Sequence, residues 1–127
     1  MNEHKPRDLG DRTFLFACDI TNFCKKLSAS PGCSRQIASQ LLRAGTSVGA
    51  NTEEAKAAYS RREFACKNSI VLRECREVRY WVRLLIATEL ADAKTTQALL
   101  QEANELVGIF TATVRRARQP QSSSESF

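Results

Sequence analysis

Hydrophobic residues recur along the chain with the spacing of one face of a helix, in four separate segments. The spacing of three to four residues holds over about 12–27, 34–58, 60–90 and 92–118. The apolar lines are Phe16, Ile20, Phe23 and Leu27, then Ile37, Leu41, Ala44, Val48 and Ala55, then Val71, Cys75, Val78 and Val82, and finally Leu99, Ala103, Leu106, Phe110 and Val114. Four amphipathic helices joined by short loops predict an all-α fold, an antiparallel up-and-down four-helix bundle.

Local signals mark the ends of these helices. Small residues and helix breakers at 28–32 predict a turn after the first helix. The run Ser60–Glu63 matches a capping box, in which the serine hydroxyl accepts a hydrogen bond from the glutamate backbone N–H. Tyr59 and Phe64 stand where the two residues of a hydrophobic staple would be. The helix that starts here would be about 45 Å long, the longest of the four.

The chain divides into one folded domain and two polar ends. Asp92 can cap the last helix, and three arginines in its last turn suit the negative end of the helix dipole. The expected parts are a flexible N-terminal segment (1–10), the four-helix bundle (11–118) and a disordered polar tail (119–127). A chain of 127 residues, 43% of them hydrophobic, is long enough to bury a core without a disulfide or a metal. No apolar run approaches the roughly 18 residues of a membrane span.

Residue types that serve catalysis and metal binding are scarce. The only histidine is His4, so a histidine base or ligand is missing from the predicted bundle. Five cysteines without a C-x-x-C pair fit neither a disulfide framework nor a zinc site, and they indicate free thiols. We therefore expect no catalytic residue, no metal site and no cofactor. The polar N-terminus shows no secretory signal, which predicts a cytoplasmic protein without a membrane partner.

Positive charge is concentrated on the third predicted helix. The chain has a net charge of +5, and residues 61–83 hold seven basic and three acidic residues, a net charge of +4. At 100° per residue, four of these arginines share an arc of about 120° with Tyr80. With Arg62 they make up the candidate nucleic-acid-binding surface, called the arginine face below: Arg62, Arg73, Arg76, Arg79 and Arg83.

The arginine face allows three interpretations. Each guanidinium can direct two donors at a phosphate, which indicates binding of RNA or DNA by phosphate contact without base specificity. A second interpretation is a scaffold whose arginine face docks an acidic protein partner and does not itself bind nucleic acid. The third is a solvated helix face whose charges are partly paired with Glu74, Glu77 and neighbouring acids.

The third helix also carries a second apolar arc, separate from its core face. Ile70, Trp81 and Leu84 fall in this arc, together with Glu77. A helix of a small monomeric bundle needs only one apolar face, and tryptophan is enriched at interfaces. The arc therefore predicts the interface of a homo-oligomer. The alternative is that these side chains cover an edge of the bundle.

The second helix carries a polar line beside a face of small residues. The residues of this line that we expect to form polar contacts are Arg43, Ser47, Asn51 and Glu54. Without a neighbouring histidine or nucleophile, they predict hydrogen bonds between helices or subunits and no catalysis. Gly45 and Gly49 each cost the helix about 1 kcal/mol, which the close approach of another helix would offset.

Several of these runs together resemble a known family. They are residues 40–51, which contain Arg-Ala-Gly-Thr-Ser-Val-Gly-Ala-Asn, then Glu54, Ala55, Ser60, Phe64 and Lys67, and finally residues 74–85, which contain Tyr-Trp. This pattern, over about residues 9–118, resembles the bacterial four-helix-bundle family typified by proteins encoded in intervening sequences of large-subunit ribosomal RNA genes.

The resemblance implies an assembly and a set of partners. Proteins of this family are homo-oligomeric bundles, commonly ring-shaped pentamers, without an assigned enzymatic activity. A related branch, the accessory variability proteins of diversity-generating retroelements, forms basic barrels that bind nucleic acid and a reverse transcriptase. We therefore expect a ring-shaped homo-oligomer, a pentamer, whose partners are RNA or DNA, or a nucleic-acid-processing protein such as a reverse transcriptase.

Overall fold

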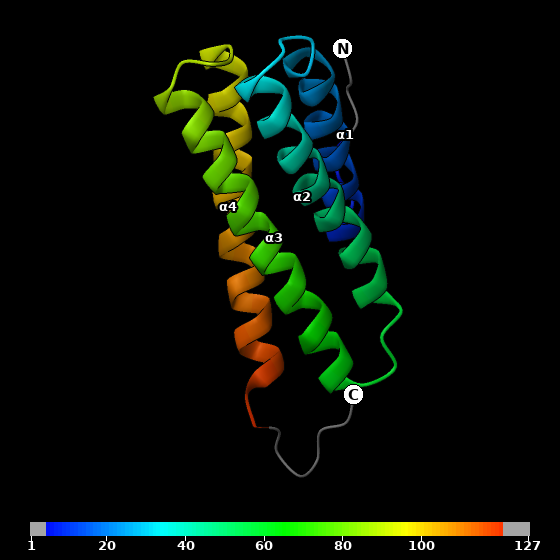
Figure 1. Ribbon diagram of the computed structural model, residues 1–127. Helices are drawn as coiled ribbons and strands as arrows, with labels where there is room; N and C mark the ends of the chain where they lie inside the picture. Colours follow the sequence, from blue (N-terminus) through cyan, green and yellow to red (C-terminus); the bar gives the residue numbers. More distant parts are fainter. Residues whose placement is uncertain (1–4, 121–127) are drawn as a thin grey trace.

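The protein is a bundle of four helices that alternate in direction (Figure 1), as the hydrophobic pattern predicts. The computed structural model describes residues 5–120, and this part of the chain contains no strand. The helices are α1 (Leu9–Leu27), α2 (Cys33–Lys56), α3 (Arg61–Ala87) and α4 (Ala93–Arg118). With 27 residues, α3 is the longest of them, and α1, with 19, is the shortest.

Side-chain caps begin three of the helices. The Ser60 hydroxyl accepts a hydrogen bond from the Glu63 N–H at 3.0 Å, and Asp92 accepts one from the Thr95 N–H at 2.8 Å, both at the predicted helix starts. Asp8 caps α1 in the same way through Asp11. Because of this cap, α1 begins at Leu9, inside the segment 1–10 that the sequence analysis expected to be flexible.

One expectation about the segments outside the helices is wrong, and another falls mostly outside the described residues. The proposed hydrophobic staple is wrong, since the Tyr59 side chain is 88% exposed and packs against little. Residues 1–4 and 121–127 lie outside the described residues, so most of the expected disordered tail does as well. The last helix, α4, ends at Arg118.

The predicted apolar lines meet in one core. Every residue of the lines on α1, α3 and α4 is buried, and on α2 only Ile37 is partly exposed. Consecutive helices pack closely in pairs, α1 on α2, α2 on α3 and α3 on α4, whereas α1 and α4 make little contact with each other. The fourth side of the bundle, between α1 and α4, is therefore the least closely packed.

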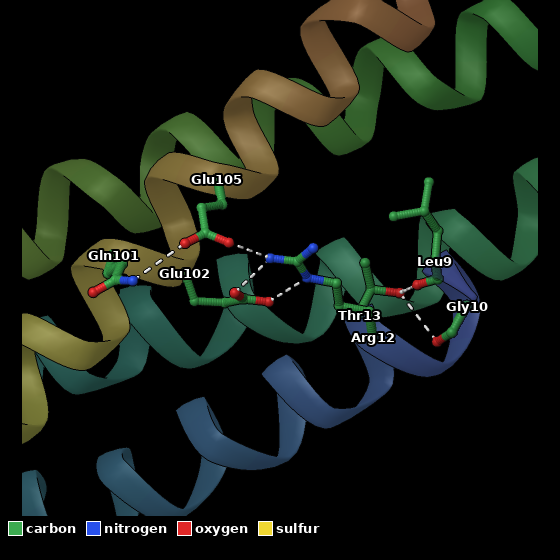
Figure 2. A network of polar contacts seen from close by, with 7 residues as sticks. All are labelled: Leu9, Gly10, Arg12, Thr13, Gln101, Glu102 and Glu105. Atoms are coloured by element: carbon green, nitrogen blue, oxygen red, sulfur yellow. Dashed lines mark hydrogen bonds and ion pairs between the residues drawn. The ribbon is translucent and has the colours of Figure 1, made fainter. Parts of the chain in front are cut away.

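Arg12 of α1 links this weakly packed side to α4 (Figure 2). Its Nε and Nη2 donate to the two Glu102 carboxylate oxygens at 2.7 and 2.8 Å, and Nη2 also donates to Glu105 at 2.8 Å. The Gln101 amide supports Glu105 from the same helix. A bidentate guanidinium–carboxylate pair is among the stronger polar contacts, so this network fixes α1 against α4 where packing is thin.

Candidate nucleic-acid interface

The arginine face lies on the solvent side of α3. Arg62, Arg73, Arg76 and Arg83 are exposed, and Arg79 is half-buried. Tyr80 lies among them with its side chain 55% exposed, and its ring meets that of Trp81 edge-on, with 5.1 Å between the centroids. The helix thus presents five guanidinium groups and one accessible aromatic ring on one surface.

The two acids expected to neutralise this face are held by another helix. Arg43 of α2 donates from Nη1 to the Glu74 carboxylate at 3.3 Å and from Nη2 to the Glu77 carboxylate. Among residues 5–120, the five arginines of the arginine face form no ion pair and no hydrogen bond. This arrangement differs from the interpretation in which Glu74 and Glu77 pair with the arginines of their own helix.

Arg43 also sets the ionisation of Glu77. The hydrogen bond from Arg43 is the main reason that the pKa of Glu77 lies below its ordinary value of 4.5, and a bond from the Trp81 ring N–H at 3.1 Å lowers the pKa further. Since the pKa is lower in the folded state, Glu77 stabilises the fold fully above pH 4.5. This contribution is lost as the pH falls through the folded-state pKa.

We expect the Glu77→Gln variant to be less stable than the wild type at pH 7. Acidification should then cost the variant less stability than it costs the wild type, because one native-state carboxylate with a lowered pKa has been removed. Urea unfolding at pH 7, 5, 4 and 3 measures both effects. An equal loss of stability in the two proteins below pH 4.5 would contradict the coupling of Glu77 to Arg43.

The rest of the polar line on α2 makes one contact with α3 and one hydrogen bond within α2. Glu54 pairs with Lys67 of α3 at 4.0 Å, so the line contacts α3 at both of its ends, through Arg43 and Glu54. In its middle, the Asn51 side-chain amide donates to the Ser47 carbonyl oxygen at 3.0 Å, a bond within α2. The line therefore acts mainly as a seam between α2 and α3.

The predicted interface residues lie in three different settings along α3. Trp81 packs partly against the core and bonds to Glu77, as the bundle-edge alternative describes. Leu84 is half-buried beside a hollow between α3 and α4, and Ile70 lines another hollow near the start of α3. Sequence reasoning missed a further apolar surface, where Phe14 is 63% exposed beside a groove of small side chains between α1 and α2.

The described residues offer few groups for metal binding or thiol chemistry. Residues 5–120 contain no cluster of three histidine, cysteine or acidic side chains that could hold a metal ion. Burial raises the pKa of the Cys24 thiol to about 11 and that of Cys75 to about 12, so both stay protonated at neutral pH. None of the described helices is long and apolar enough to cross a membrane.

Comparison with known proteins places this arrangement in a family. A family model described as 23S rRNA-intervening sequence protein matches residues 8–112, which include all of α1, α2 and α3 and most of α4. The chain belongs to this family. The match agrees with the resemblance carried by the Gly-Thr-Ser and Tyr-Trp runs of the sequence.

A solved structure supports this assignment. The crystal structure of a protein with unknown function from the S23 ribosomal protein family of Bacteroides thetaiotaomicron is 32% identical, with a TM-score of 0.77. The match covers 85% of this chain and 99% of that chain. None of the curated proteins compared with the chain matches it. The comparisons thus give the family and the fold.

Proposed function

We propose that this protein is a non-enzymatic, cytoplasmic protein that binds RNA or DNA by phosphate contact through the arginine face. One observation carries the proposal: five guanidinium groups gather on one surface of α3, and none of them forms an ion pair or a hydrogen bond with an acidic side chain of the described residues. The hydrogen bond from Arg43 contributes most to the lowered pKa of Glu77, whereas Arg73 acts on that carboxyl through its charge alone and contributes least. An unpaired guanidinium keeps its donors available, and a phosphate oxygen is the acceptor that its forked geometry fits.

The dimensions of the face suit a nucleic-acid backbone. From Arg73 to Arg83 the helix rises about 15 Å, which is long enough to span several phosphates of one strand. The exposed Tyr80 ring lies within this stretch and offers a surface on which a base can stack in any sequence. Contacts of these two kinds bind a strand without reading its base edges.

The test is the salt dependence of binding to a short single-stranded RNA and to DNA of the same sequence. Replacing Arg76 and Arg83 by glutamine should weaken binding and reduce the slope of log K against log salt by about 1.4, because two phosphate contacts are lost. The matched control replaces Lys25 and Lys26, two exposed cations in the last turn of α1, and removes the same charge. We expect the control to keep nearly the wild-type slope.

Two results would contradict this function. An unchanged slope in the Arg76/Arg83 variant would remove the arginine face from the binding site. Background affinity of the wild type for both nucleic acids, with a single acidic protein recovered in stoichiometric amount from the cytoplasm, would favour the docking of a protein partner such as a reverse transcriptase. In that case the same arginine substitutions should abolish recovery of the partner.

We further propose that the protein assembles into a ring, a pentamer, through the surface that holds Trp81 and Leu84. Ile70, the third residue predicted for this interface, lines the hollow at the start of α3 and stays outside the interface. The half-buried Leu84 supports this choice, because it keeps an apolar surface at the edge of α3. Light scattering should give a mass several times the 14.2 kDa of one chain, and Leu84→Asp should reduce it to 14.2 kDa. Dissociation by Phe14→Asp and not by Leu84→Asp would place the interface on α1 and α2 instead.

A further inference from the structure

A basic hollow lies where the first turns of α3 meet the last turn of α4, at one end of the arginine face. Its volume is about 700 Å³, within the range of small-molecule sites. Four arginines and no acidic residue line it: Arg61, Arg62, Arg73 and Arg118. Arg62 and Arg73 also belong to the arginine face, so the hollow continues that surface onto a second helix. Figure 1 shows these two helix ends side by side.

Two of the four guanidinium groups are held in place by the fold. Arg61 donates from Nε to the Ala117 carbonyl oxygen at 3.0 Å and from Nη2 to the Arg116 carbonyl oxygen at 2.9 Å. These carbonyls end α4 and carry the partial negative charge of its dipole, which Arg61 compensates. The end of α4 therefore contributes little repulsion toward an anion in the hollow.

Arg118, at the end of α4, is held by a side chain of α3. Its Nη2 donates to the Ser69 hydroxyl oxygen at 2.7 Å, and that hydroxyl in turn donates to the Ala65 carbonyl oxygen at 2.9 Å. The remaining pair, Arg62 and Arg73, is exposed and has no hydrogen-bond partner in the described chain. The hollow thus combines two oriented guanidinium groups with two that are free to close on a ligand.

We propose that this hollow binds the terminal phosphate of a nucleic-acid strand, with the strand continuing along the arginine face. The inference rests on the proposed function and deepens it. A terminal phosphomonoester carries a charge of about −1.5 to −2 and three acceptor oxygens, whereas each internal phosphodiester carries one negative charge. Four arginines around one hollow match the terminal group, while Arg76, Arg79 and Arg83 follow one another along α3 and match internal phosphates.

The experiment compares three versions of one short oligonucleotide, with a 5′-phosphate, a 3′-phosphate or hydroxyl groups at both ends. At fixed salt we expect the wild type to bind at least one phosphorylated version roughly tenfold more tightly than the hydroxyl version, from added charge-assisted hydrogen bonds. The version that gains identifies which end of the strand the hollow accepts. Equal gains for both versions mean that it accepts the monoester from either end.

Arg118→Gln supplies the structural control. Arg118 is exposed and bonds only to Ser69 among the described residues, so its loss leaves the core unchanged, as circular dichroism can verify. The variant should lose most of the preference for the phosphorylated strand and keep its affinity for the hydroxyl version. The matched control is Arg115→Gln, which removes one exposed charge from the same turn of α4 outside the hollow and should keep the preference.

The possible failures are distinguishable. If the wild type binds the three oligonucleotides equally well, the hollow is not a terminal-phosphate site, although the proposed function stands. If Arg118→Gln keeps the full preference, the terminal phosphate is bound elsewhere and the inference is overturned. If none of the three oligonucleotides binds, the proposed function fails, and the inference fails with it.

Discussion

Replacing Phe16 by alanine is expected to cost about 3–5 kcal/mol of the free energy of unfolding. Phe16 is 2% exposed and lies in the core cluster with residues of all four helices. The substitution removes most of an aromatic side chain from a close-packed interior, where helix backbones relax only partly into the space left behind. A loss of this size is a large fraction of the 5–15 kcal/mol that stabilises a typical domain.

Phe14 supplies the matched control two residues earlier in α1. Its side chain is 63% exposed, so the same substitution there should change stability by no more than about 0.5 kcal/mol. Urea unfolding of both variants, followed by circular dichroism at 222 nm, measures the difference. Equal losses at the two positions would show that Phe14 is buried in solution, and would support an interface on α1 and α2.

The contrast between these two phenylalanines also shows why most of the fold could be predicted from the sequence. Phe16 falls on the line that continues through Ile20 and Phe23, whereas Phe14 falls off it. The position of a helix and of its apolar face depends mainly on residues close together in sequence, because the helical period and the caps involve residues only a few positions apart. The four helices and nearly all core positions therefore followed from spacing alone.

The contacts between polar side chains of different helices could not be predicted in the same way. Arg43 pairs with Glu74 and Glu77 across 31 and 34 positions of sequence, and Arg12 pairs with Glu102 across 90. Such pairs depend on how far one helix is shifted and rotated against another, which hydrophobic periodicity leaves open. The same limit applies to the basic hollow, because it forms only where Arg118 and Ser69 are brought together.

This pairing changes how the arginine face is interpreted. The sequence places Glu74 and Glu77 within a helical turn of arginines, which favours neutralisation within α3. In the structure Arg43 binds both carboxylates, so Glu74 and Glu77 pair with α2 and leave the arginine face without an ion pair among the described residues. One ion-pair seam thereby joins two helices and increases the free positive charge of the proposed binding surface.

Among the glycines of the described chain, Gly45 is the one where an added side chain should disturb the helix packing most. A Cβ atom built there would lie 2.6 Å from Cγ2 and 2.9 Å from Cβ of Ile20 on α1. Ile20 is fully buried and branched at Cβ, so it cannot move aside without displacing α1. The close approach of α1 thus offsets the low helix propensity of glycine, as the Gly-x-x-x-Gly spacing predicts.

We therefore expect Gly45→Val to destabilise the protein by about 3 kcal/mol through overpacking. Gly108 of α4 is the control, because it is exposed and a Cβ atom there would meet nothing within 4 Å. Gly108→Val should change stability by less than about 0.5 kcal/mol, since valine is only slightly better than glycine in a helix. Thermal and urea unfolding of the two variants test this contrast, and similar stabilities would mean that α1 and α2 are further apart in solution.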